Sequence, residues 1–97
     1  MVCGVPNNPY PAKIINMSLG GGTDTYGVCD APFLAAIATA RANGTVVVVA
    51  AGNEDMDSNA SSPANCSDAI TVGATDSSGL RAYFSNYGNK VDISAPG

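Results

Sequence analysis

Four consecutive valines, Val46–Val49, are the feature that most limits how this chain can fold. Branched side chains are stiff at χ1 and pack well on a pleated sheet, so the run favours a strand over a helix. Because the run does not alternate apolar with polar residues, both faces of the strand must be covered. We therefore predict that Thr45–Ala51 is the central strand of a parallel sheet flanked by helices.

The polar residue that follows this strand is the first candidate for chemistry. The strand narrows to Ala50-Ala51-Gly52 and stops at Asn53. Small residues let other backbone approach closely, and open α/β sheets bind their ligands at the carboxyl ends of their strands. Asn53 is therefore a candidate functional residue. The alternative is an asparagine that only ends the strand and stabilises a turn, a role in which this residue type is common.

The composition limits the class of protein. Ninety-seven residues make one domain at most, or part of a larger one. A net charge of −4 with four basic residues argues against a nucleic-acid or anionic-membrane partner. No apolar run approaches the roughly 20 residues of a membrane span. Three cysteines without C-x-x-C spacing, and no histidine, argue against a zinc site; one disulfide with an odd cysteine left over fits an exported protein.

The remaining pattern predicts a strand–helix–strand unit with further strands after it. Asp30 is expected to cap a helix that runs through Arg41, and Asn43-Gly44 is expected to end it. The residue pattern predicts three more strands, the first of them buried: Lys13–Leu19, Ala69–Thr75 and a short final one at Val91–Ile93.

Two loops have both a structural and a functional interpretation. Gly20-Gly21-Gly22 is either a plain connection or backbone left bare for a ligand's main chain. It is not a phosphate loop, because no Lys-Ser/Thr follows and G-x-G-x-x-G is absent. The acidic loop Glu54–Asn59 starts like a calcium loop but lacks the glycine and glutamate of an EF-hand. A looser calcium site is the alternative there to a solvated loop.

Several motifs in one order resemble a known family. They comprise Asn16–Gly21 (NMSLGG), Gly44–Glu54 (GTVVVVAAGNE), Ser62–Ala64 (SPA), Ile70–Ala74 (ITVGA), Phe84–Gly88 (FSNYG) and Ala95–Gly97 (APG). The chain resembles the middle of a subtilisin-like serine protease domain from Ala12 onward, most closely the secreted bacterial branch that carries cysteines. The resemblance implies a subtilisin-like three-layer α/β/α fold. Residues 1–97 would be a partial peptidase domain with about three parallel strands and one main helix.

The resemblance also implies roles for individual residues. Asn53 matches the asparagine whose amide donates to the oxyanion of the tetrahedral intermediate. Pro63 matches a proline that follows a cis peptide, and Cys29 and Cys66 are expected to form a disulfide, with the partner of Cys3 outside the chain. The residues that match the walls and floor of the substrate cleft are Ser18, Leu19, Gly20, Gly21, Ala51, Gly52 and Ser61.

The sequence departs from the family in the catalytic triad. It has no histidine, and the family's catalytic aspartate motif and Gly-Thr-Ser-Met-Ala segment are absent. We expect these before Met1 and after Gly97, so the chain alone is predicted to be inactive. The complete protein would be a secreted serine endopeptidase that acts on polypeptides. The sequence indicates no definite cofactor, and calcium binding by the complete protein stays open. The chain's partner would be the remainder of its own domain. The alternatives are a non-catalytic α/β binding or structural module and a small Rossmann-like ligand-binding domain.

Overall fold

The main sheet has four parallel strands in the order β1-β3-β5-β6. The computed structural model describes residues 9–23 and 25–97. The valine run lies in an interior strand, and the three longer predicted strands pair in parallel as expected. The strand bounds are β1 Ile14–Met17, β3 Val46–Ala50, β5 Ile70–Thr75 and β6 Ile93–Pro96.

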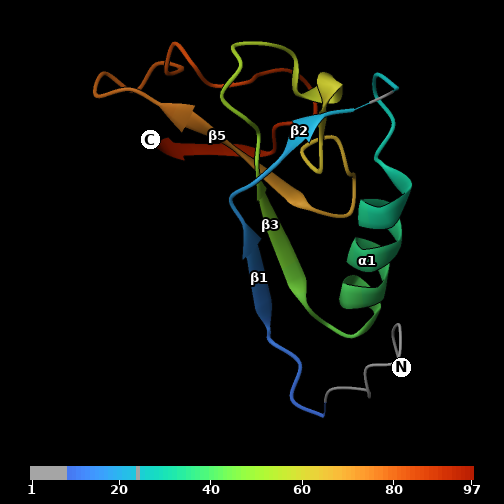
Figure 1. Ribbon diagram of the computed structural model, residues 1–97. Coiled ribbons are helices and arrows are strands. Elements are labelled where there is room, and N and C mark those ends of the chain that lie inside the picture. The colour runs from blue at the N-terminus through green and yellow to red at the C-terminus, as the bar shows by residue number, and fades with distance from the viewer. Residues whose placement is uncertain (1–8, 24) are drawn as a thin grey trace.

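One helix, α1 (Ala31–Ala42), covers the sheet on one side (Figure 1). It begins where predicted, with Asp30 as the N-cap residue, but the Asp30 side chain makes no capping bond. Its Oδ1 instead accepts a hydrogen bond from Thr23 Oγ1 at 2.6 Å. The helix ends at Asn43, and Gly44 takes the left-handed conformation with φ +85°, as predicted. No helix of the described part is long and apolar enough to cross a membrane.

The hydrophobic core lies between α1 and the sheet. Val47 and Val49 alternate along β3 toward the helix, and each is 1% exposed. They pack with Ile37 of the helix and with Cys66 and Ala69. The Cys29–Cys66 disulfide predicted from the resemblance is present, with the two Cα atoms 4.8 Å apart, and it joins the residue before α1's cap to this core. Cys3 lies outside the described residues.

The opposite side of the sheet is apolar, and no helix or strand of residues 9–23 and 25–97 covers it. The strand register places six branched side chains there in neighbouring pairs, and we call them the open face: Ile14 with Val46, Val48 with Ile70, and Val72 with Ile93. Ile14 is 65% exposed and Ile93 60% exposed. The predicted burial of Lys13–Leu19 is wrong in the described residues, since β1 is largely exposed at the sheet edge. Of the two faces of Thr45–Ala51 that were expected to be covered, α1 covers one.

A second, two-stranded sheet stands at the carboxyl end of β1. Gly21–Gly22 forms β2, which pairs antiparallel with β4 (Ser61–Ser62). The triple glycine is thus more than a connection, because its backbone takes part in a ladder. The Ser62–Pro63 peptide is cis, as the resemblance implied.

Two further predictions were wrong in detail. The final strand begins at Ile93 rather than Val91, because Asp92 precedes the ladder and its Oδ2 accepts from the Thr71 N–H at 2.8 Å. Pro96 is tolerated within it because β6 lies at the sheet edge. The acidic loop is not fully solvated, since Ser58–Ala60 forms a short 3-10 helix, η1, in which Ser58 and Asn59 are buried.

Candidate active site

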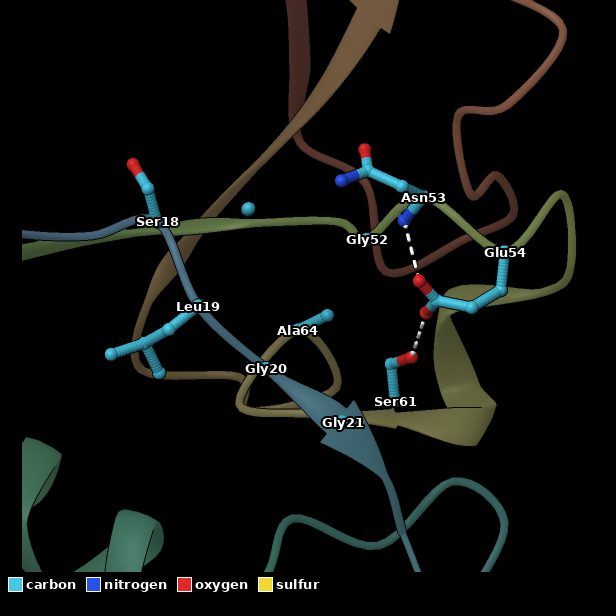
Figure 2. Close-up of a pocket in the computed structure, with 10 residues that line it drawn as sticks. Ser18, Leu19, Gly20, Gly21, Gly52, Asn53, Glu54, Ser61 and Ala64 are labelled. Atoms are coloured by element: carbon cyan, nitrogen blue, oxygen red, sulfur yellow. Dashed lines mark hydrogen bonds between the residues drawn. The ribbon is translucent and has the colours of Figure 1, made fainter.

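The end of β3 carries Asn53 out of the sheet. Ala50 is the last strand residue. Gly52 then turns the chain with φ +108°, a backbone conformation that residues other than glycine rarely adopt. Asn53 is exposed, and its backbone N–H donates to Glu54 Oε2 at 2.8 Å. Figure 2 shows the Asn53 side-chain amide pointing toward the space between this turn and Ser18. The bond to Glu54 holds the Asn53 backbone in the turn and so limits the directions in which the side-chain amide can point.

A pocket of about 190 Å³ lies between this turn and the chain that links β1 to β2. One wall is the Ser18–Gly21 segment and the other is the turn at the end of β3, with Ser61 and Ala64 at the base (Figure 2). The lining residues are Ser18, Leu19, Gly20, Gly21, Ala50, Gly52, Asn53, Glu54, Ser61 and Ala64.

The predicted site residues are brought together here, with one exception. Ala51 does not line the pocket, because side chains alternate along the strand and Ala51 is 1% exposed on the buried side. Its neighbour Ala50 lines the pocket instead. The sequence reasoning also missed Ala64 and Glu54. The position of Glu54 directly after Asn53 could have suggested it, but it was assigned to the acidic loop.

The Glu54 carboxylate links the base of the pocket to the wall formed by the Asn53 turn. Its Oε2 accepts from the Asn53 backbone N–H, and its Oε1 accepts from Ser61 Oγ at 3.2 Å (Figure 2). Hydrogen bonds to an ionised oxygen are stronger than neutral ones. The base and one wall of the pocket are therefore held by a single side chain.

In the other wall, Ser18–Gly21, the backbone at Gly20 lies close to the backbone of Ser62. A Cβ added to Gly20 would lie 3.2 Å from the carbonyl oxygen of Ser62, which is tighter than ordinary contact. Gly21 and Gly22 face open space. Within the described residues, β2 pairs with β4 only, so its other edge carries free backbone hydrogen-bonding groups beside the pocket.

The acidic loop next to the site does not gather a metal-binding group. Asp57 Oδ1 accepts from the backbone N–H and from Nδ2 of Asn59, both at 2.9 Å, while Asp55 pairs with Arg81 at 2.7 Å. The Asn59 backbone N–H lowers the pKa of Asp57, and the hydrogen bond to Asp57 raises the pKa of Tyr26. Across residues 9–23 and 25–97, no cluster of three or more potential ligands (His, Cys, Asp or Glu) is present.

Together these features define an α/β segment with an amide-bearing cleft at the carboxyl end of its parallel sheet. Residues 5–97 match the model of the subtilase family (Peptidase_S8). The chain therefore belongs to the subtilase family, and its fold is part of the subtilisin-like α/β fold.

Named relatives agree with this assignment. The chain is 50% identical over 96 residues to the "Extracellular protease" of Xanthomonas campestris pv. campestris, covering 99% of this chain and 16% of that protein. It is 48% identical over 93 residues to the "Extracellular serine proteinase" of a Thermus species, covering 96% of this chain and 21% of that protein. A solved protease of Pseudoalteromonas arctica PAMC 21717 matches with a TM-score of 0.88 and 48% identity, over all of this chain and 27% of its own. The chain thus spans less than a third of each of these relatives.

Proposed function

We propose that this chain is part of a secreted subtilisin-like serine endopeptidase, in which Asn53 donates to the oxyanion of the tetrahedral intermediate. The observation that carries the proposal is the pocket that joins the Asn53 turn to the Ser18–Gly21 wall. A preorganised amide donor can stabilise the oxyanion that develops in acyl transfer, and the pocket beside Asn53 can seat a substrate side chain. The Glu54 bond to the Asn53 backbone supports this role, because a preorganised donor need not reorient during the reaction.

The substrate is a polypeptide. The free edge of β2 supports this class, since an extended peptide can add to it as a strand through main-chain hydrogen bonds. Gly21 and Gly22 leave open space on which that strand can lie. A substrate side chain would enter the pocket of about 190 Å³ next to Asn53.

The nucleophile and the general base would come from parts of the same domain that lie outside these 97 residues. The 97 residues contain no histidine, so the general base of a Ser-His-Asp triad must lie outside them. The remainder of the same domain would supply it and would pack on the open face, because parallel sheets are normally covered on both sides. Residues 1–97 are on this view a partial peptidase domain.

Secretion of the complete protein is supported by two observations. The Cys29–Cys66 disulfide fits an oxidising compartment. The relatives named extracellular proteases are about half identical to this chain.

Asn53→Ala in the complete protease tests the proposal. We expect kcat to fall far more than KM rises, because the donor acts only where negative charge develops. The expected loss is about 10²–10³, a magnitude taken from the corresponding donor of subtilisin, a member of the same family. Asn53→Asp is expected to be worse, since a carboxylate repels the oxyanion.

The matched control is Asn43→Ala. Asn43 is also exposed, but it ends α1 and precedes β3, at the opposite end of the strand from the pocket. Its kcat and KM are expected to stay at wild-type values. Equal changes in kcat and KM for Asn53→Ala, or no change, would instead support an asparagine that only ends the strand.

A further inference from the structure

The side chain of Asn86 reaches the Asn53 turn from the loop between β5 and β6. Asn86 is 1% exposed and lies 33 positions after Asn53 in the sequence. Its backbone N–H donates to the Gly52 carbonyl at 3.0 Å. A second backbone bond joins the same two segments: the Asp55 N–H donates to the Phe84 carbonyl at 3.0 Å. Asn86 therefore lies within a segment that runs along the turn.

The Asn86 amide bonds to the chain on both sides of Asn53. Its Oδ1 accepts from the backbone N–H groups of Glu54 and Met56, at 3.0 and 3.1 Å. Its Nδ2 donates to the Ala51 carbonyl at 2.9 Å. The same nitrogen also lies 3.2 Å from Glu54 Oε1 and 3.3 Å from Ser61 Oγ.

These partners require an amide at this position. Backbone N–H groups can only donate, so they need an acceptor, and the Ala51 carbonyl can only accept, so it needs a donor. A carboxylate of the same shape would satisfy the first pair but would face the Ala51 carbonyl and the Glu54 carboxylate with negative charge. Since the amide is buried, each lost bond would leave an unsatisfied group.

Gly52 makes room for this amide. A Cβ built on Gly52 would overlap the Asn86 amide group, and Gly52 has φ +108°. The turn that carries Asn53 thus depends on two residues: Gly52, which has no side chain, and Asn86, whose buried amide fills the space beside it.

We propose that Asn86 is a positioning residue for the oxyanion donor: it fixes the Ala51–Met56 turn and thereby the direction of the Asn53 amide. This inference rests on the proposed function of Asn53. Asn86 does not line the pocket, and its amide bonds to Ala51, Glu54 and Met56 on either side of Asn53, so it acts on the reaction through the position of Asn53.

The test is a double-mutant cycle in the complete protease with Asn86→Ala, Asn53→Ala and both together. We expect Asn86→Ala to lower kcat by about 10- to 100-fold, because small misplacements of a catalytic group cost this much, with a smaller change in KM. In the Asn53→Ala background the same substitution is expected to lower kcat by less than about threefold, because residues acting through one another are not additive. Asn86→Asp, which keeps the side-chain shape, is expected to lose at least as much kcat as Asn86→Ala.

Asn89→Ala is the matched control. Asn89 lies three positions further on and accepts from Asn59 Nδ2 at 2.9 Å instead of bonding to the turn. Its kcat is expected to stay at the wild-type value.

Each other outcome overturns the inference. Equal losses of kcat with and without Asn53 would mean a general structural role. Wild-type kcat in folded Asn86→Ala or Asn86→Asp would mean that the turn holds itself, and failure of both variants to fold would assign Asn86 to folding. If Asn53→Ala itself leaves kcat unchanged, the proposed function fails as well; if Asn53→Ala lowers kcat and Asn86→Ala does not, only this inference fails.

Discussion

The cleft and the open face belong to the same sheet, but they differ in how many of their contacts the chain itself supplies. Around Asn53, the turn is held by bonds from Glu54 and Asn86 within these 97 residues. On the open face, Ile14 and Ile93 are more than half exposed. Polar bonds between loops can be satisfied locally, whereas an apolar sheet face needs a second layer. The described residues therefore hold the Asn53 turn in place by themselves but leave the open face without a second layer.

The largest expected effect is a complete absence of activity in the isolated chain. The cleft has the Asn53 amide and a pocket, but the 97 residues contain no histidine that could activate a serine. The purified 97-residue chain, incubated with a chromogenic peptide, is expected to show no turnover at any concentration. Turnover that a serine-directed covalent inhibitor abolishes would contradict this, since it would require a nucleophile and base within the chain.

Loss of the disulfide comes next. Cys29→Ser with Cys66→Ser is expected to destabilise the complete protein by roughly 4 kcal/mol, because the bond closes a loop of 37 residues in the unfolded chain. Denaturant unfolding of oxidised wild type and double variant measures the difference. Under reducing conditions the two proteins should unfold alike. A wild-type protein that is insensitive to reduction would show that the core around Cys66 does not depend on the bond.

The open face gives an effect of intermediate size. Ile93→Lys in the complete protease is expected to cost about 1.5–3 kcal/mol or more, because burying such a side chain contributes that much and the new charge must be desolvated. In the isolated chain, the same substitution is expected to reduce self-association, measured by sedimentation. Leu80→Lys is the control, since Leu80 is 68% exposed in the turn after β5 rather than on the sheet. Equal stability of the two variants would mean that the open face stays uncovered.

The smallest effect concerns the pH dependence of the Tyr26–Asp57 pair, which lies outside the pocket lining. The pKa of Tyr26 is raised above its usual 10.0, chiefly by its hydrogen bond to Asp57, so this stabilisation is present below pH 10 and is lost as pH rises through the folded value. The pKa of Asp57 is lowered below 3.8, so its contribution is present above that pH and is lost as pH falls through the folded value. Solvent screening keeps both effects small.

Tyr26→Phe checks the alkaline side. Its unfolding midpoint is expected to differ from that of the wild type at pH 8, with the difference shrinking above pH 10. The Asp57 pKa is then expected to rise slightly, because it loses one hydrogen bond. A difference that does not change with pH would place the Tyr26 contribution in packing.

Local patterns were enough to predict most elements. The valine run and the Ala69–Thr75 segment became β3 and β5, and the Asn43-Gly44 signal ended α1. These predictions succeed because β-branched runs and helix-ending glycines act over a few residues. The position of Asn53 at a strand end followed from the same reasoning.

What local patterns could not predict is which side of an element meets which neighbour. Ala50 rather than Ala51 faces the pocket because α1 packs on the side where Val47 and Val49 point. The strand pattern predicted that alternate residues share a face, but it could not say which face would meet the helix in this chain.

The sequence by itself determined β1, β3, β5, the helix and the placement of Asn53 beyond β3, since these follow from side-chain shape and backbone preference along a few neighbouring residues. Only the tertiary structure decided the bonds that hold Asn53 in place. The Asn86 amide meets Glu54 across 32 positions of sequence, and β2 meets β4 across about 40. Such contacts depend on how the loops pack at the end of the sheet, and an asparagine that fixes a turn cannot be distinguished in a sequence from one that lies in solvent.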